Sequence, residues 1–161
     1  GLLSDTHAYI NPKVAEFFAE CDEIWHAGDI GDLETAMILA SMKPLKAVVG
    51  NIDGNDLKSF YPVYQDFMCE KVKVLIIHIG GYPGKYTPEA RKLIGELKPR
   101  LFITGHSHIL KVINDPKNNL LHINPGAAGK SGMHVISTLI RFVIDGEEIK
   151  DLEVMELPKK H

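Results

Sequence analysis

The stretch "EIWHAGD", Glu23 to Asp29, gives the clearest indication of the fold class of this chain. Its first half is a short run of strand-forming residues, and its second half is a glycine turn that ends in an aspartate. A buried strand with an amphipathic helix on each side is typical of a parallel sheet that helices cover. The segments that flank residues 23–29 therefore show whether the protein has an α/β fold.

Residues 11–21 predict a helix on the N-terminal side of this stretch. Asn11 is expected to be its N-cap and Pro12 its first helical residue. One apolar face follows from the spacing i, i+3, i+4, i+7 of four residues: Val14, Phe17, Phe18 and Cys21. Before this helix, residues 1–4 (GLLS) have the composition of a buried strand end.

A second helix is expected on the C-terminal side, beginning near Asp32. Its predicted apolar face has the same spacing and consists of Leu33, Ala36, Met37 and Ala40. Residues 45–50 (LKAVVG) then form a third predicted strand. The order is strand, helix, strand, helix, strand, which predicts parallel strands packed between helices.

The remainder of the chain predicts mainly strands. Residues 62–78 (PVYQDFMCEKVKVLIIH) have the pattern of a hairpin. Thr87 and Pro88 begin a helix whose apolar face contains Ala90, Leu93, Ile94 and Leu97. Residues 101–105 (LFITG) return as a buried strand, and the last third alternates between strands and turns. One α/β domain with two β-rich halves accounts for this order.

The composition of the chain limits the classes of protein to which it can belong. The chain has 161 residues, of which 45% are hydrophobic and 24% charged, and this predicts a globular domain with a core. A formal charge of −3 gives no global field that favours nucleic acid or an anionic membrane. Two cysteines give no disulfide framework, and no apolar run is long enough for a membrane span, so a cytoplasmic protein is expected. The chain begins at Gly1 without Met, and a few residues are expected to precede it.

Polar side chains follow the ends of five predicted strands. In order along the chain they are Asp5, His7, Asp29, Asn51, Asp53, His78, His106 and His108. In α/β sheets, ligand sites form at the carboxyl ends of strands, so these side chains are expected to converge. A single histidine at a strand end is usually a surface or half-buried residue whose hydrogen bonds are satisfied. The occurrence of Asp, Asn or His after five predicted strands instead predicts a shared metal centre.

The residue types suit divalent ions such as Mn, Fe or Zn. The Asp-x-His pair at residues 5–7 and the His-x-His pair at residues 106–108 place alternate side chains on one side if each segment is extended. Gly28, Gly50 and Gly105 are expected to permit the sharp turns between strand and ligand. A metal region between these loops is the predicted result.

The ligand set is larger than one tetrahedral zinc site accepts, so it favours two ions that share a bridging carboxylate. Two ions about 3.5–4 Å apart polarise a phosphoryl oxygen and generate a hydroxide that attacks phosphorus in line. A protein nucleophile is not needed, and the sequence contains neither a G-x-S-x-G elbow nor a P-loop.

These residues resemble the motifs of the calcineurin-like metallophosphoesterase superfamily. The motifs are "SDTH" at 4–7, "GD" at 28–29, "GN" at 50–51, His78 and "GHSH" at 105–108, in the family's order. The small size and "INPG" at 123–126 are most similar to its compact bacterial and archaeal phosphodiesterase branch, which resembles the retromer scaffold subunit in fold. The resemblance implies one metallophosphoesterase domain over residues 1–161, a four-layer αββα sandwich of two mixed β-sheets flanked by helices.

The resemblance also implies two divalent ions, Mn, Fe, Zn or Ni. The first would be bound by Asp5, His7, Asp29 and His108. The second would be bound by Asp29, Asn51, His78 and His106. Asp29 would then bridge the ions, and Asn51 would also contact the substrate phosphate.

Two further side chains are expected to support this centre. Asp53 is expected to orient a ligand or its loop, and the alternative is a turn-forming aspartate that caps local amides. His26 is expected to form a structural hydrogen bond to the site, and the alternative is proton donation to the leaving group.

Two positions depart from the family pattern. Ile52 stands where many relatives have a histidine that is thought to protonate the leaving group, so the general acid is unassigned. Gly80 stands where many relatives have a substrate-side histidine. The glycine-rich loop at residues 79–86 then either binds an anion through its amides, with Lys85 nearby, or is a plain loop.

The leading hypothesis is a metal-dependent phosphoesterase that acts on a small-molecule phosphoester. A phosphodiesterase is favoured over a monoesterase, since a missing general acid impairs poor leaving groups most. The alternative is a catalytically weak or inactive metal-binding scaffold of the same fold. A membrane or nucleic acid is not an expected partner, and a homo-oligomer is left open.

Overall fold

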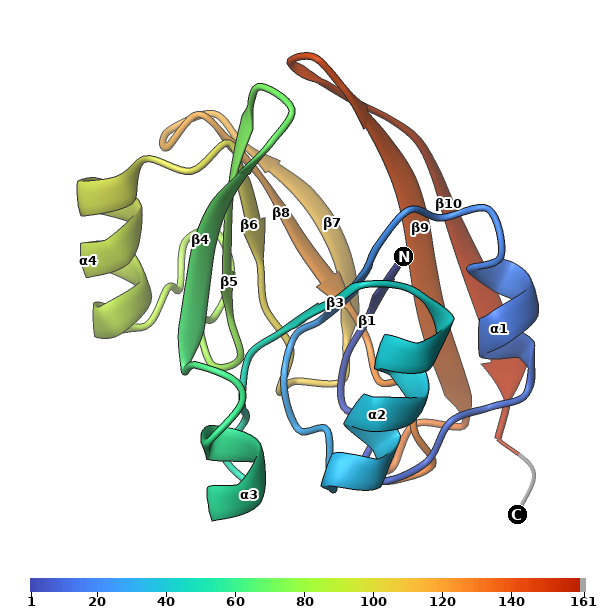
Figure 1. Ribbon diagram of the computed structural model, residues 1–161. Helices are drawn as coiled ribbons and strands as arrows, with labels where there is room; N and C mark the ends of the chain where they lie inside the picture. Colours follow the sequence, from blue (N-terminus) through green and yellow to red (C-terminus); the bar gives the residue numbers. More distant parts are fainter. Residues whose placement is uncertain (160–161) are drawn as a thin grey trace.

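The computed structural model describes residues 1–159, in which two five-stranded sheets face each other (Figure 1). The first sheet has the order β10 (Glu148–Pro158), β9 (Ile136–Asp145), β1 (Leu2–Leu3), β2 (Ile24–His26) and β3 (Leu45–Ala47). The second has the order β4 (Tyr64–Cys69), β5 (Val72–Ile77), β6 (Leu101–Ile103), β8 (Leu120–Pro125) and β7 (Leu110–Asp115). Both sheets are mixed, because β1, β2 and β3 are parallel, as are β5, β6 and β8, while the other pairs are antiparallel.

Helices cover the outer face of each sheet. The helices α1 (Lys13–Phe17) and α2 (Leu33–Met42) lie on the first sheet, and α4 (Pro88–Leu97) lies on the second (Figure 1). Strand residues alternate between layers: Leu2 packs between the two sheets, whereas Leu3 packs against α1. This burial of both faces explains why the short parallel strands are almost entirely apolar. The predicted four-layer arrangement is confirmed.

The first helix is shorter than the sequence predicts. It ends at Phe17 rather than near Cys21, although Val14, Phe17 and Phe18 are buried as expected. The helix begins at Lys13 with Pro12 at the N-cap position, so the prediction of Asn11 as N-cap and Pro12 as first helical residue is wrong by one residue. The Asn11 side chain accepts a hydrogen bond from the Lys13 amide at 2.9 Å.

The predicted face of α2 is partly wrong. Asp32 caps this helix by accepting from the Thr35 amide, as expected. However, Met37 is 64% exposed, and the buried side chains are Thr35, Ala36 and Leu39. Most residues of this helix are apolar, so spacing alone did not fix which face turns inward. The four-residue helix α3 (Asn55–Lys58) had no sequence signal that we detected.

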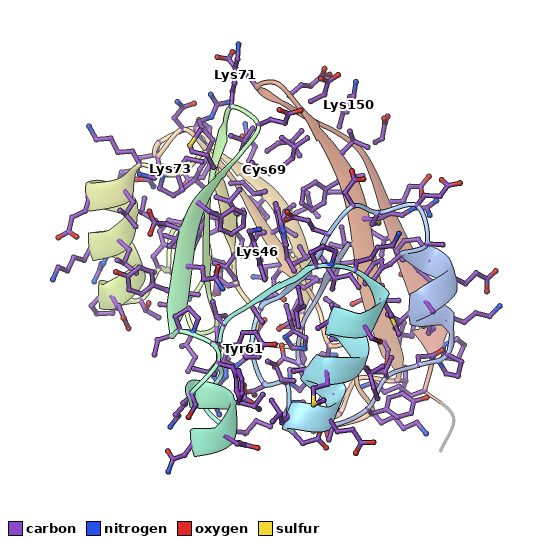
Figure 2. The ribbon with its side chains drawn as sticks, viewed as in Figure 1. Lys46, Tyr61, Cys69, Lys71, Lys73 and Lys150 are labelled. Atoms are coloured by element: carbon purple, nitrogen blue, oxygen red, sulfur yellow. The ribbon has the colours of Figure 1, made fainter. Side chains whose placement is uncertain are left out.

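The two ends of the sandwich differ. The turn between β4 and β5 meets the turn between β9 and β10, where the Lys71 amide donates to the Gly146 carbonyl at 2.9 Å. Lys71 and Lys150 mark this end in Figure 2. The parallel strands of both sheets run away from it, so their carboxyl ends meet at the opposite end. In the described part of the chain, no helix has the length and apolarity that crossing a bilayer requires.

A buried histidine of β8 makes stability depend on pH. His122 is fully buried, its Nδ1–H donates to the Phe102 carbonyl at 3.2 Å, and its Nε2 atom has no hydrogen-bond partner. Burial lowers the pKa of His122 to about 4. Below about pH 6.5 the unfolded chain binds a proton that the folded chain excludes. Stability is therefore present above this pH and is lost as the pH falls toward 4.

We expect His122→Asn, which keeps the donor to Phe102, to reduce this loss. Between about pH 7 and about pH 5, the free energy of unfolding of the variant should fall by about 2 kcal/mol less than that of the wild type. Urea unfolding at both pH values measures the difference. His134→Asn, at an exposed position, is the matched control. Equal losses in the wild type and His122→Asn would contradict the prediction.

Candidate metal centre

The structure brings the predicted ligand residues together at the end of the sandwich where the parallel strands finish. Each is carried on a loop that follows β1, β2, β3, β5 or β6. The residues are Asp5, His7, Asp29, Asn51, His78, His106 and His108. The polar atoms of six of them form two compact groups, and Asn51 contacts the second group.

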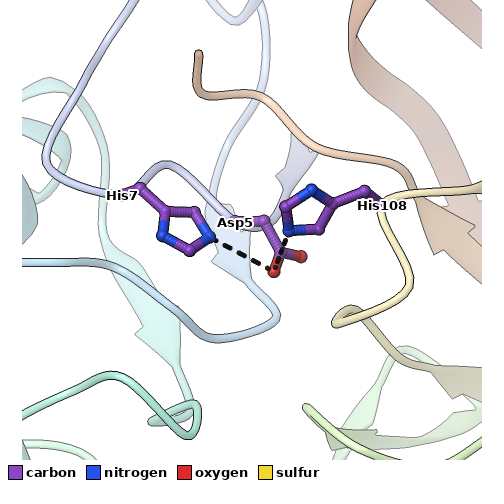
Figure 3. Close-up of side chains that lie close together, drawn as sticks. All are labelled: Asp5, His7 and His108. Carbon is purple, nitrogen blue, oxygen red and sulfur yellow. Dashed lines mark ion pairs between the residues drawn. The ribbon is translucent and has the colours of Figure 1, made fainter. Parts of the chain in front are cut away.

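The first group contains Asp5, His7 and His108 (Figure 3). Their potential ligand atoms all lie within 4.8 Å of one another. Asp5 Oδ1 lies 3.2 Å from His108 Nε2 and 3.8 Å from His7 Nε2. Asp5 Oδ1 and His7 Nε2 are buried without a hydrogen-bond partner in the described structure. Because buried polar atoms are normally paired, these two fit the coordination of a cation.

The second group contains Asp29, His78 and His106, again within 4.8 Å of one another. Asn51 joins it through Oδ1, which lies 3.1 Å from His78 Nε2 and 3.0 Å from His106 Nδ1. The other ring nitrogen of His78, Nδ1, contacts the Ala27 carbonyl at 2.8 Å. Donation from Nδ1 leaves Nε2 as a lone-pair donor, which is the tautomer that a metal ligand needs.

Asp29 lies between the two groups. Its Oδ2 atom is 3.6 Å from His7 Nε2 of the first group, and its Oδ1 atom is 3.3 Å from His78 Nε2 of the second. Each carboxylate oxygen therefore faces a different set of potential ligands. This is the geometry of a bridging carboxylate.

The electrostatics favour charged carboxylates. Burial alone would raise the pKa of Asp5, but the neighbouring His108 and His78 rings hold it below its ordinary value. Burial would also raise the pKa of Asp29, and contact with His78 lowers it. Burial would lower the pKa of His78, whereas Asp29 and Asp5 raise it above its ordinary value. Two anionic carboxylates among imidazoles are a suitable donor set for divalent cations.

The ligand backbone is left-handed rather than extended. Positive φ angles occur at Asp5 (53°), His7 (46°), Asp29 (55°), His106 (70°) and His108 (61°). Such angles are uncommon for residues with a Cβ atom and concentrate at functional sites. The expectation that the Asp-x-His and His-x-His segments are extended is wrong, although Asp5 and His7 do reach one ligand group. His106 and His108 instead point to different groups.

The glycines next to the ligands have two roles. Gly28 has φ 101°, so it supplies the sharp turn that the sequence predicted. Gly50 serves close approach instead, because a Cβ atom there would collide with the Asp29 carboxylate and amide. The loop that carries Asn51 can therefore lie directly against Asp29.

The Asp53 side chain forms hydrogen bonds to two loops of the site. It is buried, and its carboxylate accepts three backbone hydrogen bonds: from Gly50 at 2.8 Å, from Gly31 at 2.9 Å and from Ile30 at 3.2 Å. The first is a local turn contact, and the other two cross to the loop that follows Asp29. Asp53 thus combines both roles that the sequence left open.

His26 lies behind the site. It is fully buried, its Nε2 atom contacts the Thr6 hydroxyl at 2.9 Å, and its Nδ1 atom accepts from the Gly28 amide at 3.0 Å. Burial lowers its pKa to about 3. A neutral, enclosed imidazole with both nitrogens bonded does not reach a leaving group. The geometry favours the structural hydrogen bond over proton donation.

Two polar residues near Asp5 were missed by sequence reasoning. The Ser4 hydroxyl donates to Asp5 Oδ2 at 2.6 Å, and the Thr6 hydroxyl donates to the Ile30 carbonyl at 2.8 Å. Both are fully buried. The signal was available, because two hydroxyl residues flank Asp5 in "SDTH", at positions where a buried strand ends.

The two departures from the family pattern have different surroundings. Ile52 is 47% exposed, and its backbone N–H donates to Asp29 Oδ1 at 3.1 Å. Its side chain offers no proton. Gly80 is buried, and a Cβ atom there would lie 2.6 Å from the Thr104 side chain and 2.8 Å from Phe102. The packing around Gly80 therefore leaves no room for the histidine of other relatives.

Comparison with known proteins identifies the family to which this chain is similar. Residues 1–147 match the calcineurin-like phosphoesterase superfamily domain. A protein of Methanothermobacter thermautotrophicus named "Probable metallophosphoesterase" is 29% identical, over 96% of this chain and 90% of its own length.

Two solved structures share the fold. Vps29 of Entamoeba histolytica superposes with a TM-score of 0.76 at 17% identity, over 98% of this chain and 97% of that one. A structure described as a novel archaeal phosphodiesterase gives a TM-score of 0.74 at 21% identity, over 98% of both chains. The family match, rather than these fold similarities, assigns the chain: it belongs to the calcineurin-like phosphoesterase superfamily.

Proposed function

We propose that this protein is a phosphodiesterase that requires two divalent metal ions. The observation that carries the proposal is the position of Asp29, whose two carboxylate oxygens face different ligand groups at 3.6 Å and 3.3 Å. The buried, unpartnered Asp5 Oδ1 and His7 Nε2 atoms support it, because a cation would satisfy both.

The proposed ligand sets follow the two groups. Asp5, His7 and His108 would hold one ion, together with Asp29. His78, His106 and Asn51 would hold the other, again with Asp29. When bound, two such ions polarise phosphoryl oxygens and lower the pKa of water, which supplies a nucleophile near neutral pH.

The protein residues would position the substrate and hold charge. Asn51 carries its carboxamide at the rim of the second group, where its N–H groups can donate to a phosphoryl oxygen while Oδ1 faces the histidines. His26 is too enclosed to donate a proton, and Ile52 has none to donate. The reaction would then depend on leaving groups that depart without protein assistance, which favours diesters with weakly basic leaving groups.

Turnover of two nitrophenyl substrates tests this proposal. We expect metal-loaded protein to hydrolyse bis(p-nitrophenyl) phosphate with a higher kcat/KM than p-nitrophenyl phosphate, and chelation should abolish both activities. The release of nitrophenolate, measured with Mn, Fe, Zn and Ni in turn, gives the rates. The absence of turnover on either ester by protein with two bound ions would sink the enzyme assignment. Preference for the monoester would overturn the phosphodiesterase assignment alone.

The second candidate is a weakly active or inactive metal-binding scaffold of the same fold. A run of exposed apolar side chains favours it, because such surface is typical of protein contacts. The residues are Phe60 (67% exposed), Val63 (57%), Tyr64 (39%) and Met68 (60%). They lie in or just before β4, an edge strand of the second sheet. Metal binding without turnover would support this candidate over the enzyme.

A further inference from the structure

A basic pocket of about 410 Å³ is lined in part by chain segments that adjoin the candidate metal centre. Its lining includes Tyr9, Asn11, Lys13, Lys130, Ser137 and Lys159. Among residues 1–159, three lysines and no carboxylate line this pocket. The volume is within the range of small-molecule sites.

This charge is unusual for the chain, whose formal net charge is −3. A second pocket, of about 430 Å³, shows the opposite pattern. Its lining includes the carboxylates of Glu20, Asp22, Glu23, Glu70, Asp151 and Glu153. Positive charge is therefore gathered locally at the basic pocket, where it would attract an anion.

Two of the residues that line the basic pocket, Tyr9 and Lys130, belong to chain segments that contact or include Asp5 and His7. Tyr9 follows His7 by two residues, and its amide donates to the Thr6 carbonyl at 3.0 Å. Lys130 follows Gly129, whose amide donates to the Asp5 carbonyl at 3.1 Å. The basic pocket and the first ligand group therefore share two chain segments.

Lys130 is the cation with the least compensation in this pocket. Its ammonium lies 4.3 Å from the centre of the Tyr9 ring, and it forms no ion pair within residues 1–159. Lys13, by contrast, pairs with Glu16 at 3.0 Å. Lys159 donates to the Ser131 carbonyl at 2.9 Å. The Tyr9 ring holds the Lys130 ammonium in place without neutralising it.

We propose that the basic pocket binds a second anionic group of the substrate, a phosphate or a carboxylate, while the scissile phosphoester lies at the metal centre. The inference rests on the proposed function for the position of the ester. Lysine suits this role because its ammonium is a compact point charge that binds phosphate and carboxylate oxygens. The small volume of the pocket and the net negative charge of the chain favour a small molecule over a nucleic acid strand.

Calorimetry on the metal-loaded protein tests the pocket separately from turnover. Thymidine 3′,5′-bisphosphate and thymidine 5′-monophosphate differ only in the second phosphate. We expect the bisphosphate to bind about tenfold more tightly, the size of one charge-assisted hydrogen bond. Lys130→Ala should abolish this difference and leave the affinity for the monophosphate unchanged. Lys92→Ala, at an exposed site in α4, is the matched control and should retain the difference.

Three results would overturn the proposal. The first is equal affinity for the two nucleotides in the wild type, and the second is an unchanged preference in Lys130→Ala. The third is a loss in Lys130→Ala of affinity for a labelled single-stranded oligonucleotide but not for the bisphosphate, which would assign the surface to nucleic acid. Failure of the proposed function looks different, because it gives no turnover whatever the nucleotide affinities are.

Discussion

Asp29→Ala is expected to lose both metal ions and all measurable turnover. One carboxylate serves both ligand groups, with Oδ2 at 3.6 Å from His7 and Oδ1 at 3.3 Å from His78. Its removal leaves each ion with one anionic ligand fewer, and the second group then contains only neutral ligands. Changes to outer partners of metal ligands typically cost 10- to 100-fold in affinity, so the loss of a shared ligand should exceed about 100-fold. Calorimetric metal titration and elemental analysis measure it.

The fold of the variant should survive. Asp29 follows β2 on a loop and belongs to none of the hydrophobic clusters that form the core. Asp29→Asn is a second variant that retains an acceptor for the Ile52 amide. Asp66→Ala, at an exposed position in β4, is the matched control and should bind two ions normally. If Asp29→Ala retains both ions, or loses only one, the bridging assignment is wrong.

Asp53→Ala is expected to destabilise the metal-free protein and to weaken metal binding. The change leaves the buried amide of Gly50 and the amides of Ile30 and Gly31 without their acceptor. A buried group that loses its partner costs about 1–3 kcal/mol, so the free energy of unfolding should fall by about 3 kcal/mol or more. Metal affinity should fall about 10- to 100-fold, because two of the hydrogen bonds that join the loops carrying Asp29 and Asn51 are lost.

The variant Asp53→Asn distinguishes the effect of the carboxylate charge from the effect of the hydrogen bonds between the loops. It retains one acceptor oxygen but places an N–H₂ group against an amide, so we expect an intermediate loss of stability. Denaturant unfolding of the metal-free variants and metal titration of the same samples give both quantities. The Asp66→Ala control should match the wild type in both. A change in unfolding free energy below about 0.5 kcal/mol in Asp53→Ala would show that these hydrogen bonds do not hold the loops.

Much of the architecture could be predicted from local pattern. Apart from the unpredicted α3, the order of strands and helices was correct because short apolar runs bounded by glycine have few alternatives, and the Thr87-Pro88 start of α4 was correct in detail. The face of α2 was not predicted correctly, since a helix in which most residues are apolar has no unique hydrophobic stripe. The early end of α1 was not predicted either, although Phe17 and Phe18 at that end both lie in the hydrophobic cluster under this helix.

Some features of the candidate site could likewise be predicted from local pattern, and others could not. The set of side chains that converge could be predicted from residue order alone, because parallel strands place the residues that follow them at one end of a sheet whatever the details of packing. The division of these side chains between two groups depends on the three-dimensional arrangement: His106 and His108 lie in different groups, Asp29 lies between the groups, and Asp53 accepts hydrogen bonds from amides of a distant loop. The reason is that left-handed turns and contacts between loops depend on the neighbouring segments, which residue spacing does not record.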